Sequence, residues 1–435
     1  MRIRDFLEID FILFFAVFVL VGVGILFIYS SGITSDGIQI SDEYKRQIVW
    51  ALAGVVLTLV IAVFNYRQIY DLSIYLYLSA IVLLIATVIF ASVFHGSRWI
   101  RIGSFGIQAS EFAKITTILF LAWFLDTTKR NQNNFVRFAI SCCIVFFPML
   151  LVLIQPDLGT ALVFIPILLG MTYIAGISLR YILFFVLFII FSGVFLVLPL
   201  WQTIILKNSI PVLTILSNTR FIMASCFTLL LILAIAAFGF ARYHKRYFYW
   251  ISYVTMIFIF SLGASFAAQK VLREYQIMRL IIFIDPNVDP RGSGWHIIQS
   301  VTAIGSGGAF GKGYLQGTQS HYRFLPEQST DFIFSILSEE WGFIGGFLVF
   351  ALFLVIILRL IRIMRITPDA FGSYIVSGLL SMYTFHFLIN VGMTMGIMPI
   401  TGIPLMFVSY GGSALVTAMT GIGLASSVHV RRYLH

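Results

Sequence analysis

Apolar runs of about twenty residues recur along nearly the whole chain, and they constrain its fold more than any other feature. A helix needs about 20 apolar residues to cross the hydrocarbon core of a membrane. Charged residues are mostly confined to the stretches between these runs. The pattern predicts an all-α, polytopic membrane bundle of about 12 transmembrane helices. The predicted spans are residues 9–30, 48–64, 72–94, 110–125, 137–155, 160–176, 180–200, 219–241, 248–269, 331–358, 371–395 and 404–428.

Composition supports a membrane protein and excludes several other classes. Of the 435 residues 60% are hydrophobic and 11% charged, whereas a soluble domain carries about 25% charged residues. The net charge of +10 comes without a basic run, so we expect no nucleic-acid partner. Cys142, Cys143 and Cys226 lie in apolar runs without metal-ligand spacing, which predicts neither a disulfide nor a zinc site. No cleavage site of small residues follows the first run, so we expect a retained helix.

Positive charge is distributed unevenly between the two sides of the predicted bundle. With the N-terminus in the cytoplasm, the short outer loops hold five basic residues, namely Lys45, Arg46, Arg98, Arg101 and Lys207. The inner loops hold fifteen of the 28, namely Arg2, Arg4, Arg67, Lys129, Arg130, Arg137, Arg180, Arg242, Lys245, Arg246, Arg359, Arg362, Arg365, Arg431 and Arg432. Basic residues favour the cytoplasmic side. Both termini are therefore predicted to be cytoplasmic.

One stretch, 270–330, is long and polar, and this topology places it outside the cell membrane as an extracytoplasmic loop. It holds eight glycines between Gly292 and Gly317. A phosphate-binding P-loop would need glycine six residues before Lys312 and Ser or Thr after it, and the sequence has Ser306 and Gly313 there. We expect instead turns that use glycine for positive φ and close packing. Long loops are uncommon unless they are functional.

Asp331 stands where this loop ends and a predicted helix begins. Proline, then Ser, Thr and Asp, then an apolar run is typical of a helix N-terminus, so Asp331 could be a capping acid. It could equally be a carboxylate at the outer mouth of the bundle that accepts a proton. Glu339 and Glu340 follow two helical turns deeper, and a structural ion pair is the favoured interpretation for them.

Three further charges lie near predicted outer helix ends. Glu111 and Lys114 are neighbours on one helix face, and Asp157 occupies another outer loop at the same predicted depth. They could meet in a buried structural network, or Lys114 could contact a lipid-linked phosphate. Arg98 and Arg101 flank a tryptophan, which favours anchoring at lipid head groups, although a diphosphate site would also use such arginines.

Taken together, several motifs in this order resemble the SEDS family of peptidoglycan glycosyltransferases. The resemblance covers the chain from about residue 90 to its end, and a segment 317–319 (GTQ) ahead of 324–327 (FLPE) is similar to the elongation (RodA) branch rather than the division (FtsW) branch. The motifs are 98–103 (RWIRIG), 108–114 (QASEFAK), 155–160 (QPDLGT), Tyr275-Gln276 with Arg279 before Asp285-Pro286, 325–334 (LPEQSTDFIF) and 402–412 (GIPLMFVSYGG).

The resemblance implies an enzyme that polymerises lipid II at the outer face of the bacterial cytoplasmic (inner) membrane and releases undecaprenyl diphosphate. It implies that Asp331 is the catalytic general base, and a class B penicillin-binding protein and MreC/MreD as partners. Residues expected to bind substrate are Arg98, Arg101, Glu111, Lys114, Asp157 and Glu327. The leaving diphosphate needs positive charge, which Lys114, the two arginines or a divalent cation (Mg²⁺ or Mn²⁺) could supply.

The family usually has ten spans, so the chain is expected to be a single SEDS membrane domain, 1–435, with an inserted helix pair within 219–269. An even insertion keeps 270–330 and Asp331 outside. Two other functions stay open from the residues alone: a lipid-linked precursor flippase or transporter, which intramembrane acids and broken helices would suit, and a non-catalytic scaffold of the cell-wall synthesis complex. Most motifs lie in outer loops rather than at mid-membrane depth, which favours the enzyme.

Overall fold

The computed structural model is a helical protein whose helices match the predicted spans. It describes residues 10–93, 99–102, 105–129, 133–201, 219–271, 274–290 and 292–432. Each of the twelve predicted spans coincides with a helix, which confirms the all-α fold class. These helices are α2 (Phe11–Ser31), α3 (Glu43–Val63), α4 (Ile69–Val93), α5 (Ala109–Thr127), α6 (Asn134–Ile154), α7 (Leu158–Ile174), α8 (Leu179–Trp201), α10 (Thr219–Tyr243), α11 (Arg246–Val271), α15 (Ile333–Ile366), α16 (Ala370–Thr394) and α17 (Gly412–Val430).

Ten helices among the described residues are long and apolar enough to cross a membrane. The two predicted spans outside this set are α5 and α7. Helix α7 has 17 residues, and α5 carries the charged residues Glu111, Lys114 and Asp126. The chain is a multi-pass membrane protein, and the two helices outside this set are those that carry predicted site residues at their starts.

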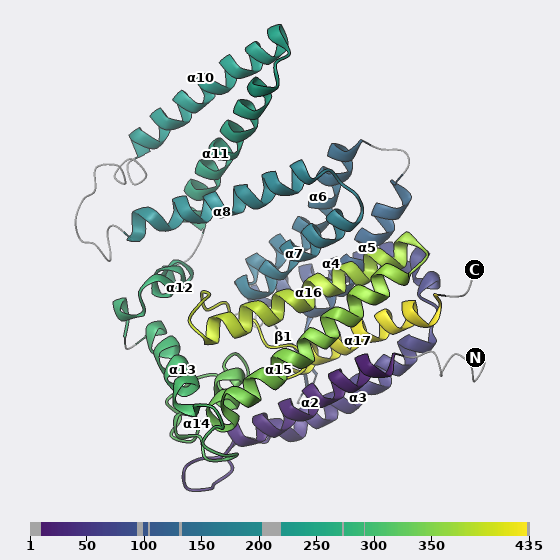
Figure 1. The fold of residues 1–435 in the computed structure, drawn as a ribbon, viewed down its shortest axis with the longest axis vertical. Helices are drawn as coiled ribbons and strands as arrows, with labels where there is room; N and C mark the ends of the chain where they lie inside the picture. The colour runs from purple at the N-terminus through teal and green to yellow at the C-terminus, as the bar shows by residue number, and fades with distance from the viewer. Residues whose placement is uncertain are drawn as a thin grey trace. The chain divides into compact units, whose positions relative to one another are not determined.

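Contacts divide the chain into two compact units, of which the first contains residues 1–177 and 299–435. Helix α17 packs along α3, α16 packs against α5 and α7, and α15 packs against α2 and α16, as Figure 1 shows for the lower helices. Nearly every residue of α17 is buried. The core of this unit therefore lies around α16 and α17, the helices that follow the predicted catalytic segment.

The second unit contains residues 178–298. Helix α11 packs against α8 and α10, and the Tyr253 hydroxyl donates to the carbonyl of Arg180 at 2.7 Å. Helices α10 and α11 form an antiparallel pair (Figure 1) that reverses at His244, which has a φ of 53°. The unit ends with α12 (Glu274–Ile284), the short helix η3 (Pro286–Val288) and the first residues of α13 (Ser293–Gly307).

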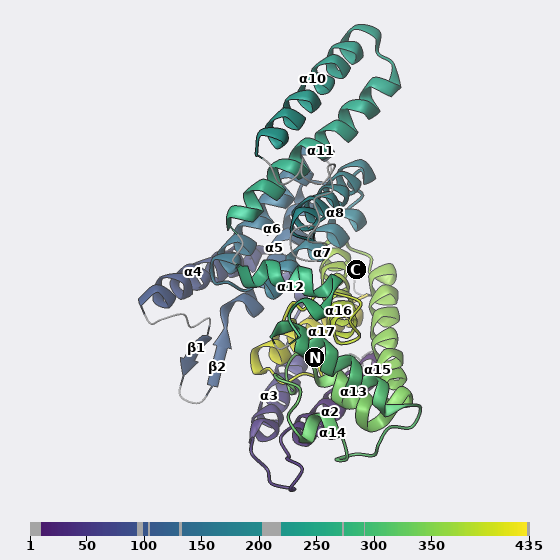
Figure 2. The same ribbon diagram turned by 90° about the vertical axis from the view of Figure 1, so that its left-hand side faces the viewer.

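Two sequence expectations about element boundaries are wrong, and one element was not predicted. The stretch 270–330 is not a plain loop, because it contains α12, η3, α13 and α14 (Thr318–His321). The last helix begins at Gly412 rather than 404, because the apolar residues before it form an irregular loop. Between α4 and α5 the chain forms an unpredicted hairpin of β1 (Trp99–Ile102) and β2 (Phe105–Gln108), which are antiparallel, with Trp99 opposite Gln108, as Figure 2 shows.

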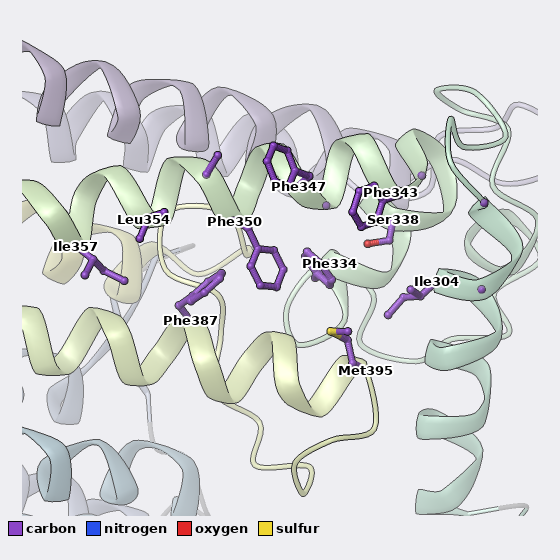
Figure 3. A pocket seen from close by; sticks show the side chains of 15 residues that line it. Ile304, Phe334, Ser338, Phe343, Phe347, Phe350, Leu354, Ile357, Phe387 and Met395 are labelled. Carbon is purple, nitrogen blue, oxygen red and sulfur yellow. The ribbon is translucent and has the colours of Figure 1, made fainter.

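Helix α15 is broken at Gly342, where φ is 65° and ψ is −158°. The ring centroids of Phe334 and Phe350 are 6.0 Å apart. In a straight helix residues sixteen positions apart would be separated by about 24 Å, so the chain reverses at Gly342 and the short helix 333–341 runs back beside 343–366, as Figure 3 shows. The sequence predicted that Glu339 and Glu340 lie deeper along a continuous helix. The reversal shows that this prediction is wrong.

Candidate functional site

Asp331 lies in the turn that precedes the short helix 333–341. The helix begins at Ile333, and its N-cap residue, Phe332, makes no side-chain capping bond. Asp331 therefore lies one residue before the N-cap position. Asp331 is half-buried, and its carbonyl accepts a hydrogen bond from the Asn390 amide at 3.0 Å. Its Oδ2 would be 3.4 Å from a Cβ placed on Gly402, so the carboxylate faces the loop 401–411.

The loop 401–411 is hydrogen-bonded to the segment that carries Asp331. The amide N–H of Tyr410 donates to the carbonyl of Ser329 at 2.8 Å, and the hydroxyl of Ser409 donates to the carbonyl of Thr330 at 2.5 Å. Both segments contain a non-glycine residue with positive φ, Glu327 at 48° and Phe407 at 69°. Such residues are uncommon, and they persist where the surrounding structure over-determines them. The two segments thus form one constrained framework around Asp331.

Lys114 and Glu111 form a buried ion pair at the start of α5. Their Nζ and Oε1 atoms are 2.9 Å apart, and the side chains are 0% and 3% exposed. The prediction that they meet on one helix face is confirmed. Lys114 Nζ also lies 3.2 Å from Nε2 of His386 on α16. The second carboxylate oxygen of Glu111 has no hydrogen-bond partner among the described residues, which is costly for a buried charged group.

Asp157 is the N-cap of α7 and lies beside the same loop. Its carboxylate accepts from the Thr160 amide N–H at 3.1 Å and from the Gln108 side chain at 2.7 Å. A Cβ on Gly159 would lie 2.5 Å from the carbonyl oxygen of Thr401, so the start of α7 touches the 401–411 loop. Asp157 reaches α5 through Gln108, three residues before Glu111.

For the remaining predicted substrate-binding residues, Arg98, Arg101 and Glu327, the structure gives fewer contacts. Arg98 lies outside the described residues, and of Arg101 the structure gives the strand position, opposite Gly106. The carbonyl of Gly106 accepts from the Ser413 hydroxyl at 3.2 Å, which joins the hairpin to α17. Glu327 is exposed, and its Oε2 accepts from the Thr330 hydroxyl at 3.3 Å.

The carboxylate of Glu339 holds the glycine-rich segment 307–317 and the turn that follows it. It is 0% exposed and pairs with Lys312 at 2.7 Å, and it accepts from the N–H groups of Thr318 and Gln319 at 2.8 and 3.0 Å. The predicted structural ion pair is confirmed for Glu339. A Cβ on Gly311, which has a φ of 79°, would lie 2.0 Å from the carbonyl oxygen of Glu340, so the expected use of glycine for turns and close packing is confirmed as well.

Glu340 forms a second set of contacts at the same end of the short helix. Its carboxylate accepts from the Ser30 hydroxyl at 2.5 Å and from the Leu315 N–H at 3.1 Å. His321 Nε2 lies 3.5 Å from Glu340 Oε1. The nearby Glu340 carboxylate raises the pKa of His321 above its ordinary value, although burial acts in the opposite direction. These contacts tie the segment after the glycines to α2.

Two residues that contact the site, His386 and Asn390, were missed by the sequence analysis. Each is a polar residue with apolar neighbours on both sides in α16, and the motifs drew attention elsewhere. Their spacing of four residues was a usable signal, because it places both on one face of a helix. Polar side chains within a spanning helix usually face the interior of the bundle and mark function.

A cavity of about 700 Å³ lies between α16 and the two parts of α15, 333–341 and 343–366. It is separate from the charged residues described above. Figure 3 shows Phe334, Phe350 and Phe387 projecting into it. Ser338 contributes the one polar side chain among its lining residues, and none of the predicted site residues lines it. The cavity suits an apolar group, whereas proton transfer and diphosphate binding require the polar cluster around Asp331 and Lys114.

The fold and this cluster together define a multi-pass membrane protein with a partly buried ionic site. The chain belongs to the family described as "Cell cycle protein" (FTSW_RODA_SPOVE), whose model matches residues 11–210 and 209–434. This finding confirms the resemblance to the SEDS family that the motifs indicated.

Two relatives and one solved structure illustrate the similarity. Peptidoglycan glycosyltransferase RodA of Treponema pallidum (strain Nichols) is 50% identical over 434 residues, which are 99% of this chain and 100% of the relative. Peptidoglycan glycosyltransferase MrdB of Escherichia coli (strain K12) is 33% identical over 391 residues, 89% of this chain and 86% of the relative. A structure described as "Structural coordination of polymerization and crosslinking by a peptidoglycan synthase complex" has a TM-score of 0.67 at 24% identity, with 98% of this chain and 99% of that chain covered, and supports the fold.

Proposed function

We propose that this chain is a peptidoglycan glycosyltransferase that polymerises lipid II during cell elongation, with Asp331 as its general base. The relatives named as peptidoglycan glycosyltransferases cover nearly the whole chain. The observation that carries the proposal is the position of Asp331, a half-buried acid between the 401–411 loop and α16, whose His386 contacts the buried Lys114. Glycosyl transfer from a diphosphate needs an acid to accept a proton and a cation to stabilise the leaving group. Asp331 and Lys114 are these two charges.

The reaction follows from the chemistry of these two groups. The acceptor sugar hydroxyl attacks the anomeric carbon of the donor, the bond to the diphosphate breaks, and undecaprenyl diphosphate leaves. Asp331 takes the hydroxyl proton as the new bond forms, and one displacement inverts the anomeric centre. Lys114 stabilises the negative charge that develops on the leaving diphosphate. Glu111 holds Lys114 in place, and Asp157 and Glu327 border the same site.

Arg98, Arg101 and a divalent cation are further proposed sources of positive charge. Within the described ranges no three His, Cys, Asp or Glu side chains gather into a metal site. Mg²⁺ commonly uses one or two carboxylates together with substrate phosphates. A bound Mg²⁺ or Mn²⁺ would therefore need the substrate's diphosphate as well as an acid such as Asp331, and its chemistry would be to neutralise diphosphate charge.

The test is polymerisation of lipid II by the purified protein together with its partner. Glycan strands should form with the wild-type protein. A protein that binds or moves lipid-linked precursors across vesicles and makes no glycan under these conditions would instead support the flippase hypothesis. A protein that stimulates its partner without forming any glycosidic bond would support the scaffold.

The proposed setting is the bacterial cytoplasmic membrane, with both termini in the cytoplasm and a class B penicillin-binding protein and MreC/MreD as partners. The similar fold in a peptidoglycan synthase complex supports an assembly of this kind. Cysteines introduced at the exposed positions Tyr322 and Lys129, in a chain without Cys142, Cys143 and Cys226, test the topology. An impermeant reagent added outside should label position 322 and spare position 129, and the reverse would contradict it.

We also propose that the chain functions as one SEDS domain in which α10 and α11 are an inserted pair. The family model matches in two stretches, 11–210 and 209–434; the second begins shortly before α10 and includes both helices, so the proposal rests on the family's usual ten spans. A deletion of 219–269 that still folds should retain part of the polymerase activity. Complete loss of activity in a well-folded deletion would place the pair in the catalytic machinery.

A further inference from the structure

His386 is the buried side chain that links the lysine of the proposed site to the 401–411 loop. It is 1% exposed. Its Nε2 lies 3.2 Å from Lys114 Nζ, and its Nδ1 lies 3.1 Å from the carbonyl oxygen of Pro404. Both ring nitrogens are therefore within hydrogen-bond distance of a partner, one on α5 and one in the loop.

The two partners fix the protonation state of the imidazole. A carbonyl oxygen can only accept, so Nδ1 must carry the proton that is donated to Pro404. An ammonium group can only donate, so Nε2 must be the unprotonated nitrogen that accepts from Lys114. A doubly protonated ring would place an N–H and a second positive charge against Lys114. The contacts thus require the neutral imidazole with its proton on Nδ1.

A lysine held in this way has little freedom. Its ammonium sits on a flexible four-carbon stem, and Glu111 alone constrains it from its own helix. His386 adds a second contact from α16, so the position of Nζ depends on two helices. The ammonium has three N–H donors, of which these two contacts use two. Lys114 is 0% exposed in this structure, so the third reaches a diphosphate oxygen only when substrate binding opens the site.

Asn390 extends the same connection to the catalytic segment. It lies four residues after His386 and on the same face of α16. Its amide donates to the carbonyl of Ile403 at 2.8 Å and to that of Asp331 at 3.0 Å. One turn of a single helix therefore contacts Lys114 through His386 and the Asp331 peptide through Asn390, which fixes the distance between the cation and the acid.

We infer that His386 is a positioning residue that orients the Lys114 ammonium toward the leaving diphosphate by accepting one of its hydrogen bonds. This inference rests on the proposed function, because it assigns Lys114 to the diphosphate. His386 itself takes no proton from substrate. Its contribution is to hold the cation where the negative charge develops.

Two substitutions separate the two hydrogen bonds. His386→Gln can place its side-chain oxygen near the position of Nε2 and accept from Lys114, but it loses the Nδ1 donor. His386→Asn can place its amide nitrogen near the position of Nδ1 and donate to Pro404, but it loses the acceptor. A hydrogen bond to a charged group is worth about 10- to 100-fold. We expect kcat/KM for lipid II to fall by about that factor in His386→Asn and by about threefold or less in His386→Gln.

The matched controls are His429→Gln and His429→Asn, because His429 is another buried histidine, on α17. They measure the general effect of replacing a buried imidazole and should leave kcat/KM nearly unchanged. Affinity for undecaprenyl diphosphate, measured on the same preparations, should fall for His386→Asn and persist for His386→Gln. Thermal unfolding of each variant corrects the activities for the folded fraction.

Three results would overturn the inference. If the His386→Asn and His386→Gln variants had the same activity and product affinity, the contact with Lys114 would be unimportant. A His386→Asn variant more active than His386→Gln would show the same. Both results leave the proposed function standing. A wild-type complex that makes no glycan would remove the proposed function and the inference together.

Discussion

The two ends of the short helix 333–341 carry acids in opposite circumstances. At one end Glu339 is fully buried, and its carboxylate accepts from Lys312 and from two backbone N–H groups of the glycine-rich loop. At the other end Asp331 is half-buried, lies one residue before the N-cap, and faces the 401–411 loop. A carboxylate surrounded by donors stabilises its loop and would lose contacts if it took a proton. The contacts of Glu339 give it a structural role, and the chemical role remains the one proposed for Asp331.

The largest expected effect tests the chemical end of this comparison. Asp331→Asn keeps the shape of the side chain but cannot accept a proton at neutral pH. We expect the folded variant to lose about 10²- to 10⁴-fold in the rate of lipid II polymerisation, the range typical of a lost general base. The measurement is glycan formation by the variant with its partner, corrected for folded protein.

Asp369→Asn is the matched control, because Asp369 does cap a helix, accepting from the N–H of Gly372 at 2.9 Å. Asparagine is also a good cap, so this variant should fold and remain active. Near wild-type polymerisation by Asp331→Asn would sink the assignment of Asp331 and make Glu327 the next acid to test.

The second prediction concerns the buried ion pair between Lys114 and Glu111, which belongs to the same proposed site as Asp331. Lys114→Met leaves Glu111 buried without its cation, and breaking a buried pair costs about 3–5 kcal/mol. The double variant with Glu111→Gln removes both charges and should recover most of that stability, as measured by thermal unfolding. We expect it to remain inactive, because the cation for the diphosphate is gone. A stable and active double variant would show that the pair serves packing alone.

Sequence reasoning found the helices because a run of twenty apolar residues is a strong signal, and it found the Glu111–Lys114 pair because spacing along one helix is local. It did not find the reversal at Gly342, although Ser338, Glu339 and Glu340 interrupt the apolar run just before that glycine, because only tertiary contacts show the fold-back. His386 was missed for a related reason. A lone histidine in an apolar helix acquires meaning from Lys114, which is 272 residues away in sequence.

The third prediction addresses the structural end of the short helix. Glu339→Gln keeps an acceptor for the loop N–H groups but loses the ion pair with Lys312. We expect a loss of about 1.5–3 kcal/mol in the free energy of unfolding, the range for a hydrogen bond to a charged group. Polymerisation per folded molecule should stay within about threefold. The measurements are thermal unfolding and trypsin cleavage at Lys312 and Arg323, which should become faster as the loop loosens.

Asp42→Asn is the control for that experiment, since it breaks an exposed pair with Lys45 whose side chains are 63% and 62% exposed. Exposed pairs contribute about 0–1 kcal/mol, so this change should be barely measurable. If Glu339→Gln abolished activity in a stable protein, Glu339 would belong with Asp331 among the chemical acids and the comparison would fail.

The smallest expected effect is a pH dependence at the same structural end. The Glu340 carboxylate, 3.5 Å from Nε2 of His321, raises the pKa of His321 in the folded protein above its ordinary value of 6.5. A group whose pKa is raised by folding contributes stability that is fully present below its unfolded pKa and is lost as the pH rises through the folded pKa. His321→Gln should therefore lower the melting temperature most below about pH 6.5, by about 1–2 °C, and the difference should shrink toward pH 8.5. His244→Gln, at an exposed histidine, should show no such trend. A difference between wild type and His321→Gln that stays constant from pH 5.5 to 8.5 would mean that His321 stabilises the loop by packing and by its bond to the Ile33 carbonyl, without its charge.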